Sequence, residues 1–282
     1  MAITDADRER LHDFRASLDE RNVDNVARTA SYLELYAWTR RNPPDLPWIF
    51  MAHLVSRNAG YLMTDVARRI AAATDPMLAD AMRNLFVLLE RANFLIFHDA
   101  WHHVCAHLAG DTASLAPPRT PAFMCDAWRR YEAAGAPSPA RERALVLDLV
   151  HNEQHLIEHR AVHHPELAPG LRLLFLIEAT GKERPLVFPW PDATPPPEIR
   201  AGKFAVVERR IATGTEIFDR VLADHARRAA MFDWARAHPH TGSREVHGGP
   251  AGPGVREVWP VALVRTLWRD IHAPPAPDAR YP

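Results

Sequence analysis

The feature that most constrains this chain is the clustering of its prolines, which leaves long stretches where apolar residues recur with helical spacing. Most prolines gather at 43–47, 117–121, 137–139, 165–169, 185–197, 250–253 and 274–282. Proline breaks helix interiors but suits turns and the first helical turn, so these clusters indicate connections between helices. Glycine makes up only 12 of the 282 residues, which disfavours a fold of many β-hairpins. We therefore predict an all-α fold, a single-domain multi-helix bundle.

Two long helices are predicted at the centre of this bundle. Asp75 followed by Pro76 is typical of a helix start, and Gly110 of the end of the same helix. The pair Ser138 and Pro139 opens the second long helix, which is expected to end near His163. Shorter helices are predicted at roughly 22–41, 46–57, 61–74, 121–134, 170–180, 204–238 and 259–271.

The connections and the chain's C-terminal part are predicted to be less regular. If the 204–238 helix is broken, we expect the break at Gly214. Residues 181–200 and 239–258 read as irregular loops. The domain is expected to span 1–272, looser in its C-terminal third, with a proline-rich tail at 273–282.

Charge and cysteine usage exclude several classes of protein. The 34 basic and 35 acidic residues leave no basic surplus, so nucleic acid is not an expected partner. The most apolar stretch, Leu85–Phe97, contains Glu90 and Arg91 and is too short to cross a membrane. Cys105 and Cys125 form no Cys-x-x-Cys pair, and the first residues do not resemble a signal peptide. We expect a soluble cytoplasmic protein of undetermined oligomeric state.

The second long helix carries one glutamate that does not fit its polar face. On a helical wheel, Glu153 lies in the middle of the apolar stripe, between Leu149 and Leu156 on one side and Val150 on the other. Glutamates are seldom fully buried without a partner. We therefore predict an internal partner for Glu153, and Arg160, two turns later, is one candidate.

The first long helix repeats this pattern. Glu90 lies at the centre of its apolar stripe, with Asn93 and His98 at the edges. Asp99 and His103 fall on the opposite face, where we expect them to contact water. Each of the two long helices thus presents a glutamate to the predicted core.

Histidines recur every four residues along the second long helix. His151, His155, His159 and His163 share one stripe, with Asn152 beside them, on the side away from the apolar residues. The simplest interpretation is a row of side chains that faces water. The alternative is a metal site on the surface or at an interface.

The 46–57 helix brings further polar groups towards the core. His53 lies within its apolar run, where a hydrogen-bonded structural histidine is the ordinary alternative to a functional one. Arg57 has the reach to bind a buried carboxylate with two hydrogen bonds. Asn58 and Asp65 either belong to the same site or cap helix ends.

Three hypotheses follow for this polar cluster. The first is a divalent metal such as iron, manganese or zinc, held by Glu90, Glu153 and His98. A standard di-iron site is disfavoured, because the only Glu-x-x-His is Glu9 with His12 near the N-terminus. The second is a buried acid–base carboxyl, and the third is a purely structural network.

For a functional site, the predicted catalytic group has four members: Glu90, Glu153, His53 and Arg57. A glutamate would act as general base or metal ligand, and the arginine would hold an anionic part of a small-molecule substrate. Three further residues would contact the substrate: Asn58, Asn93 and Asp65. The reaction is not determined, and the alternative is a non-enzymatic interaction or scaffold protein in which the cluster is structural.

Three segments carry a family resemblance. They are MAHLVSRNAGYLMTD at 51–65, LLERANFLIFHDA at 88–100 and NEQHLIE at 152–158. Together they resemble the YppC-like proteins, a bacterial family of unknown function, over roughly residues 25–180. The resemblance implies a cytoplasmic bacterial protein and supplies no activity.

Overall fold

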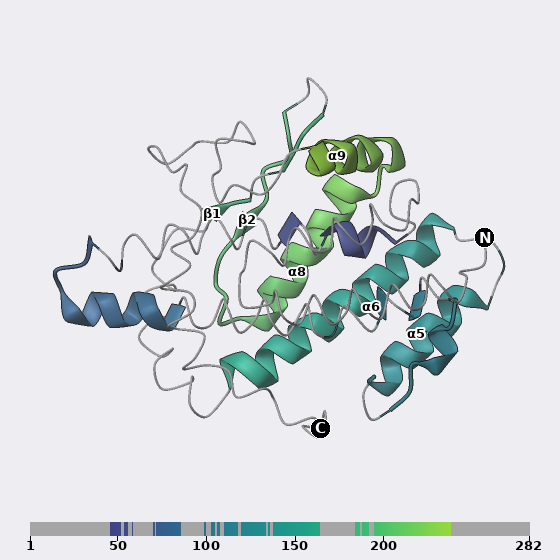
Figure 1. Cartoon of the computed structure of the whole chain (residues 1–282), viewed down its shortest axis with the longest axis horizontal. Helices are drawn as coiled ribbons and strands as arrows, with labels where there is room; N and C mark the ends of the chain where they lie inside the picture. The colour runs from purple at the N-terminus through teal and green to yellow at the C-terminus, as the bar shows by residue number, and fades with distance from the viewer. Residues whose placement is uncertain are drawn as a thin grey trace.

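The fold is known from a computed structural model. It describes residues 46–51, 54–55, 58, 70, 72–85, 99, 103–104, 106–107, 110–117, 120–133, 135, 138–163, 184–186, 188–191 and 195–237. Of these residues, 72% are helical and 2% lie in strands. The predicted all-α class is therefore confirmed (Figure 1).

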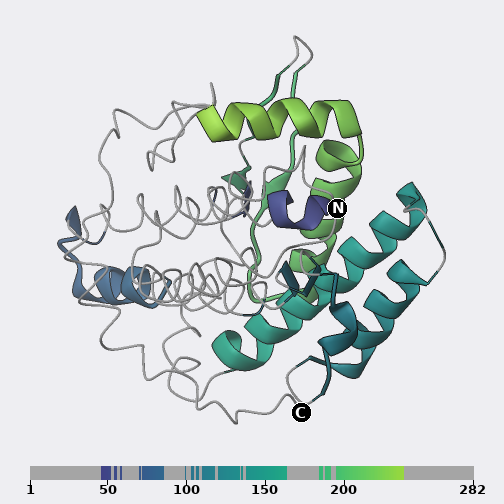
Figure 2. The ribbon, with the colours of Figure 1, turned by 45° about the vertical axis from the view of Figure 1, so that its right-hand side comes forward.

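Two neighbouring helices form the best-defined part of the fold. Helix α5 spans Ala122–Glu132, and helix α6 spans Pro139–Ile157 and continues into a π-helical turn, η2, over Glu158–Val162. The hydroxyl of Ser138 accepts a hydrogen bond from the backbone N–H of Arg141 at 3.4 Å, and proline occupies the first turn. The predicted start of the second long helix is thus confirmed, and α5 packs beside α6 (Figure 2).

Helix α8, Val207–Ile217, packs against α6 at a glycine. A Cβ atom placed on Gly214 would lie 2.8 Å from Cγ1 of Val150, closer than real Cβ contacts. The absence of a side chain therefore allows the two helices to approach closely. Gly214 serves helix packing, and the prediction of a break there is wrong.

The break in the predicted 204–238 helix lies further along the chain. A second π-helical turn, η3, spans Phe218–Leu222, and helix α9 spans His225–Ala237. Between them, the carboxylate of Asp224 accepts a hydrogen bond from the backbone N–H of Arg227 at 2.8 Å. This cap begins a new helix and changes the chain direction (Figure 1).

Both ends of the first predicted long helix have the expected caps. The Asp75 carboxylate accepts a hydrogen bond from the backbone N–H of Met77 at 2.9 Å, and residues 76–85 are helical. At the other end, Gly110 has a φ of 66° and its N–H donates to the carbonyl of His107 at 3.1 Å. Glycine adopts this left-handed conformation without strain. Residues 86–98, 100–102, 105 and 108–109, which the sequence predicts to belong to this helix, lie outside the described residues.

The connections contain little regular structure. A short 3-10 helix, η1, spans Thr112–Ser114. Strands β1, Arg184–Pro185, and β2, Arg200–Ala201, pair antiparallel, with Arg184 opposite Ala201. The segment predicted as an irregular loop at 181–200 therefore contains both residues of β1 and the first residue of β2.

Several predictions concern residues outside the described part of the chain. These are the helices at 22–41, 170–180 and 259–271, the loop at 239–258 and the tail at 273–282. The single-domain organisation also stays a prediction.

An apolar core joins the helical residues 47–51 to α5, α6 and α9. Its largest fully buried side chains include Trp48, Phe50, Trp128 and Phe232. The rings of Phe50 and Phe232 meet edge to face, with centroids 5.7 Å apart. Among the described residues, no helix combines the length and apolarity needed to span a bilayer. Trp48 and Trp128 also border the polar cluster that forms the candidate site.

Candidate functional site

Glu153 points into the core, as predicted. The residue is only 6% exposed, and it is surrounded on α6 by buried apolar neighbours. Its Oε1 atom is fully buried and has no hydrogen-bond partner among the described residues. Within the described part of the chain, no basic side chain forms an ion pair with this carboxyl group. The predicted partner Arg160 has its side chain outside the described set.

A second buried carboxyl group, that of Asp99, lies close to Glu153. The amide of Asn152 donates a hydrogen bond to Asp99 Oδ2 at 2.6 Å, and Nε2 of His103 lies 3.3 Å from the same oxygen. Asp99, His103 and Asn152 are all buried, so the prediction that they contact water is wrong. A helical wheel treats each helix alone, whereas here polar residues of one helix face polar residues of another.

His103 is held in one tautomer by a tryptophan. Its Nδ1 atom accepts a hydrogen bond from the indole N–H of Trp128 at 3.0 Å, and the two rings stack with centroids 6.1 Å apart. Because Nδ1 is an acceptor, the imidazole proton resides on Nε2, the atom nearest Asp99. The N–H direction falls short of hydrogen-bond geometry, so the contact with Asp99 is electrostatic.

The surroundings of Glu153 raise its pKa to about 8. Burial is the main cause, and the negative charge of Asp99 adds to it. The indole N–H of Trp48 acts in the opposite direction, although Trp48 Nε1 and Glu153 Oε1 do not meet the geometry of a hydrogen bond. The carboxyl group is therefore protonated at pH 7, and it can donate or accept a proton near neutral pH.

Only two of the predicted site residues are among those described. Besides Glu153, the structure places Asn58, which is buried and donates its side-chain N–H to the carbonyl of Leu54 at 2.9 Å. This bond stays within one helix, as the capping interpretation expects, and the substrate contact of Asn58 stays a prediction. The other predicted residues lie outside the described part of the chain: Glu90, His53, Arg57, Asn93, Asp65 and His98.

The described residues do not by themselves form a metal centre. Among them there is no group of three histidine, cysteine or acidic side chains that could hold an ion. His103 is unsuited as a ligand, because Trp128 occupies Nδ1 and Nε2 carries the proton. The predicted metal site thus depends on Glu90 and His98, and it stays a prediction.

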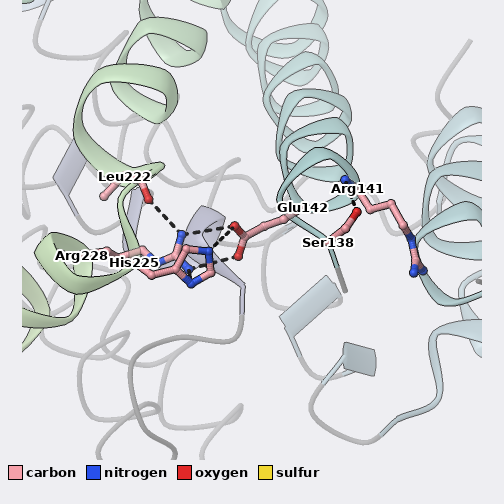
Figure 3. A network of polar contacts seen from close by, with 6 residues as sticks. All are labelled: Ser138, Arg141, Glu142, Leu222, His225 and Arg228. Atoms are coloured by element: carbon pink, nitrogen blue, oxygen red, sulfur yellow. Dashed lines mark hydrogen bonds and ion pairs between the residues drawn. The ribbon is translucent and has the colours of Figure 1, made fainter. Parts of the chain in front are cut away.

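A second buried glutamate on α6 has a full set of partners, and sequence reasoning missed it. Glu142 accepts hydrogen bonds from both terminal nitrogens of Arg228, at 3.1 and 3.4 Å (Figure 3). Arg228 also donates to the carbonyl of Leu222 at 2.9 Å, and His225 Nε2 lies 3.5 Å from Glu142. The helical wheel could have revealed Glu142, because it precedes Glu153 by about three helical turns.

Comparisons with known proteins place the chain in a family. A family model described as "Protein of unknown function (DUF2515)" matches residues 20–264. The chain is 25% identical over 232 residues to "Uncharacterized protein YppC" of Bacillus subtilis (strain 168), a match that covers 79% of this chain and 68% of that protein. No solved structure matches the chain.

These matches confirm the YppC-like resemblance and extend it beyond residue 180. The matched region includes the whole buried cluster, from Trp48 to Glu153, and also the pair of Glu142 and Arg228. The chain belongs to the DUF2515 family of proteins of unknown function.

Proposed function

We propose that the working site of this protein is the buried cluster of Glu153, Asp99, His103, Asn152 and Trp48, hereafter the Glu153 cluster. It would serve as an acid–base centre for a small molecule. The observation that carries this proposal is the Oε1 atom of a carboxyl group that is 6% exposed and has no hydrogen-bond partner in the part of the chain that the structure describes. Native proteins pair nearly all buried polar atoms, so an exception calls for an explanation.

The chemistry of this cluster is proton transfer. The neutral Glu153 carboxyl donates its proton to a bound molecule, and the resulting carboxylate accepts one back. Asn152 stabilises the neighbouring Asp99 by a hydrogen bond, and His103 Nε2 lies 3.3 Å from the same carboxylate oxygen.

The remaining members of the predicted site are part of the proposal. Glu90, His53 and Arg57 would complete the catalytic group, with the guanidinium of Arg57 holding an anionic part of the substrate. Asn58, Asn93 and Asp65 would contact the substrate. Support for these roles comes from the sequence pattern.

The test compares two conservative variants of the full chain. Glu153→Gln should be at least as stable as the wild type, because a neutral amide replaces a neutral acid and active sites tend to store unfavourable electrostatics. Glu142→Gln is the matched control, since it removes a charge from a paired glutamate of equal burial on the same helix. In a thermal-shift screen of small polar molecules, ligands that stabilise the wild type should not stabilise Glu153→Gln.

The alternative is a non-enzymatic interaction or scaffold protein in which the cluster only fixes helix packing. On that alternative, Glu153→Gln loses roughly 1–3 kcal/mol, because a partner is left unpaired. A loss of stability of this size would therefore contradict our proposal. The functional surface would then be the outer face, with the histidine stripe or the 239–258 segment.

A second candidate is an internal divalent metal, such as iron, manganese or zinc. It is favoured by the proximity of Glu153 to Asp99, whose charge raises the pKa of Glu153, since a cation would neutralise both groups. Its ligands would be Glu153 with Glu90 and His98. Elemental analysis of untagged protein, purified without metal resin, tests this. Stoichiometric metal that is lost in Glu90→Ala and Glu153→Ala would support it, and a metal-free wild type would reject it.

We also propose a cytoplasmic location in a bacterium. The relative from Bacillus subtilis supports the bacterial origin. Cys125 is a buried free thiol, and burial raises its pKa, which keeps it protonated and unreactive. Free thiols are typical of reducing compartments.

A further inference from the structure

Two exposed histidines lie next to each other on the outer face of the second long helix. The rings of His155 and His159 are almost parallel, with an interplanar angle of 7° and centroids 5.2 Å apart. Both side chains are exposed to solvent. Within the described part of the chain, neither ring has a hydrogen bond or an ion pair. Their ring nitrogens are therefore available to a ligand from solvent.

The change from α to π geometry brings these two rings together. In an ideal α-helix, residues four apart are offset by about 40° around the axis. Here α6 ends at Ile157 and the wider turn η2 begins at Glu158, between the two histidines. The wider turn reduces the offset and lets the rings face each other. Single π turns in α-helices often occur at functional sites, and the C-terminal end of an α-helix favours cations.

The neighbouring groups on the same stripe are occupied. His151 donates from Nδ1 to the carbonyl of Leu147 at 2.7 Å. His163 Nε2 lies 2.8 Å from Oε1 of Glu158, and the other oxygen of Glu158 binds Arg210. His155 and His159 thus differ from His151 and His163, the other two histidines of the stripe, which already have partners.

We propose that His155 and His159 together bind one late first-row divalent metal ion, such as Zn²⁺, Ni²⁺ or Cu²⁺. Neutral imidazole is a preferred ligand for these metals, with metal–nitrogen distances of about 2.0–2.1 Å. Two such bonds require the ring nitrogens to approach within roughly 4 Å, which rotation of two exposed side chains achieves. The described residues supply no third ligand, so water would fill the remaining positions.

This site is separate from the Glu153 cluster and does not depend on the proposed acid–base function. Glu153 is buried on the inner face of α6, whereas His155 and His159 face solvent. A metal bound here would leave the core unchanged. Variants of the two sites therefore give different results in one experiment.

Titration calorimetry with NiCl₂ tests the proposal on the untagged full chain, after treatment with a chelator. We expect one Ni²⁺ per chain in the wild type, and no binding of Mg²⁺, which prefers oxygen ligands. His155→Gln and His159→Gln should each weaken the affinity by about tenfold or more, because one of two metal–nitrogen bonds is lost. His151→Gln and Glu153→Gln are the matched controls and should keep the wild-type affinity.

Three results would overturn this assignment. The first is unchanged Ni²⁺ affinity in both His155→Gln and His159→Gln. The second is an equal loss in His151→Gln, which would indicate diffuse binding along the stripe. The third is a loss of Ni²⁺ affinity in Glu153→Gln alone, which would indicate that the metal binds in the core.

Discussion

Glu142 and Glu153 are two glutamates of one helix with the same burial and opposite surroundings. Each is 6% exposed, and both lie on the face of α6 that meets the core. Glu142 receives hydrogen bonds from both terminal nitrogens of Arg228. Glu153 instead lies near the carboxylate of Asp99, and no described residue forms a hydrogen bond with its Oε1 atom. Because the two residues are equally buried, the difference between their carboxyl groups comes from the neighbouring charged groups.

This difference in neighbours makes Glu142 a structural residue and leaves the carboxyl group of Glu153 able to exchange a proton. A buried carboxylate with a bidentate arginine is costly to disturb, because removal of either partner leaves a buried charge. A buried carboxyl group without a cation stays protonated until the pH is well above its ordinary pKa. The first group fastens α6 to α9, and the second holds a proton that can be exchanged near neutral pH.

The largest expected effect is on the pH dependence of stability. The pKa of Glu153 is about 8 in the folded protein against an ordinary value of 4.5, so the folded state holds a proton that the unfolded state releases. The free energy of unfolding therefore falls as the pH rises from 4.5 to 8, by about 5 kcal/mol in total. Glu153→Gln should lack this decline, and it should exceed the wild type by up to that amount at pH 8.

Urea unfolding of both proteins between pH 5 and pH 9 measures this difference. The two stability curves should lie close together at the acidic end and diverge as the pH rises. Parallel curves would mean that Glu153 is ionised in the folded protein, and the contrast with Glu142 would disappear.

The next effect concerns the paired glutamate. Glu142→Gln should lower the free energy of unfolding by about 3–5 kcal/mol, because the buried guanidinium of Arg228 loses its counter-charge. The double variant Glu142→Leu/Arg228→Met should recover much of this loss, since it removes both charges. Urea unfolding at pH 7 gives the comparison. A loss below about 1 kcal/mol would show that this pair is no stronger than a surface ion pair.

The smallest effect is expected at an exposed ion pair between α6 and η3. Arg143 donates two hydrogen bonds to Asp219, at 2.7 and 2.8 Å, and this pairing holds the pKa of Asp219 below its usual value. Both side chains are about 40% exposed, so solvent screens the pair. Asp219→Asn should cost less than about 1 kcal/mol at pH 7.

The sign of the pH effect at Asp219 is opposite to that at Glu153. Its contribution is present above the ordinary pKa of 3.8 and is lost as the pH falls through the lower folded value. High salt should reduce it further. Denaturation of Asp219→Asn and wild type at low and high salt would show this, and a cost that salt leaves unchanged would exclude an electrostatic origin.

Features encoded locally were predictable from the sequence. The caps at Asp75, Gly110 and Ser138 follow from residue types that satisfy or terminate a helix end within a few residues. The inward direction of Glu153 follows from the apolar residues one turn away on its own helix. Such arguments need only one helix at a time.

Features that depend on the packing of two helices could not be predicted from a wheel of one helix. Asp99 and His103 occupy the polar side of their helix, and only the packing of a second polar face against it explains their burial. The sequence alone predicts a helix break at Gly214, whereas its role is set by Val150 on another helix. A helical wheel could have placed Glu142 on the inner face of its helix, but its partner Arg228 lies 86 residues further along the chain.

The most direct test of the central claim is the titration of Glu153 itself. Carboxyl ¹³C resonances of the glutamate-labelled full chain would be followed by NMR from pH 4 to pH 10. We predict one glutamate resonance with a midpoint near pH 8, absent from Glu153→Gln and present in Asp219→Asn. If every glutamate carboxyl titrated below about pH 6, Glu153 would be an ordinary ionised group and the proposed acid–base centre would be refuted.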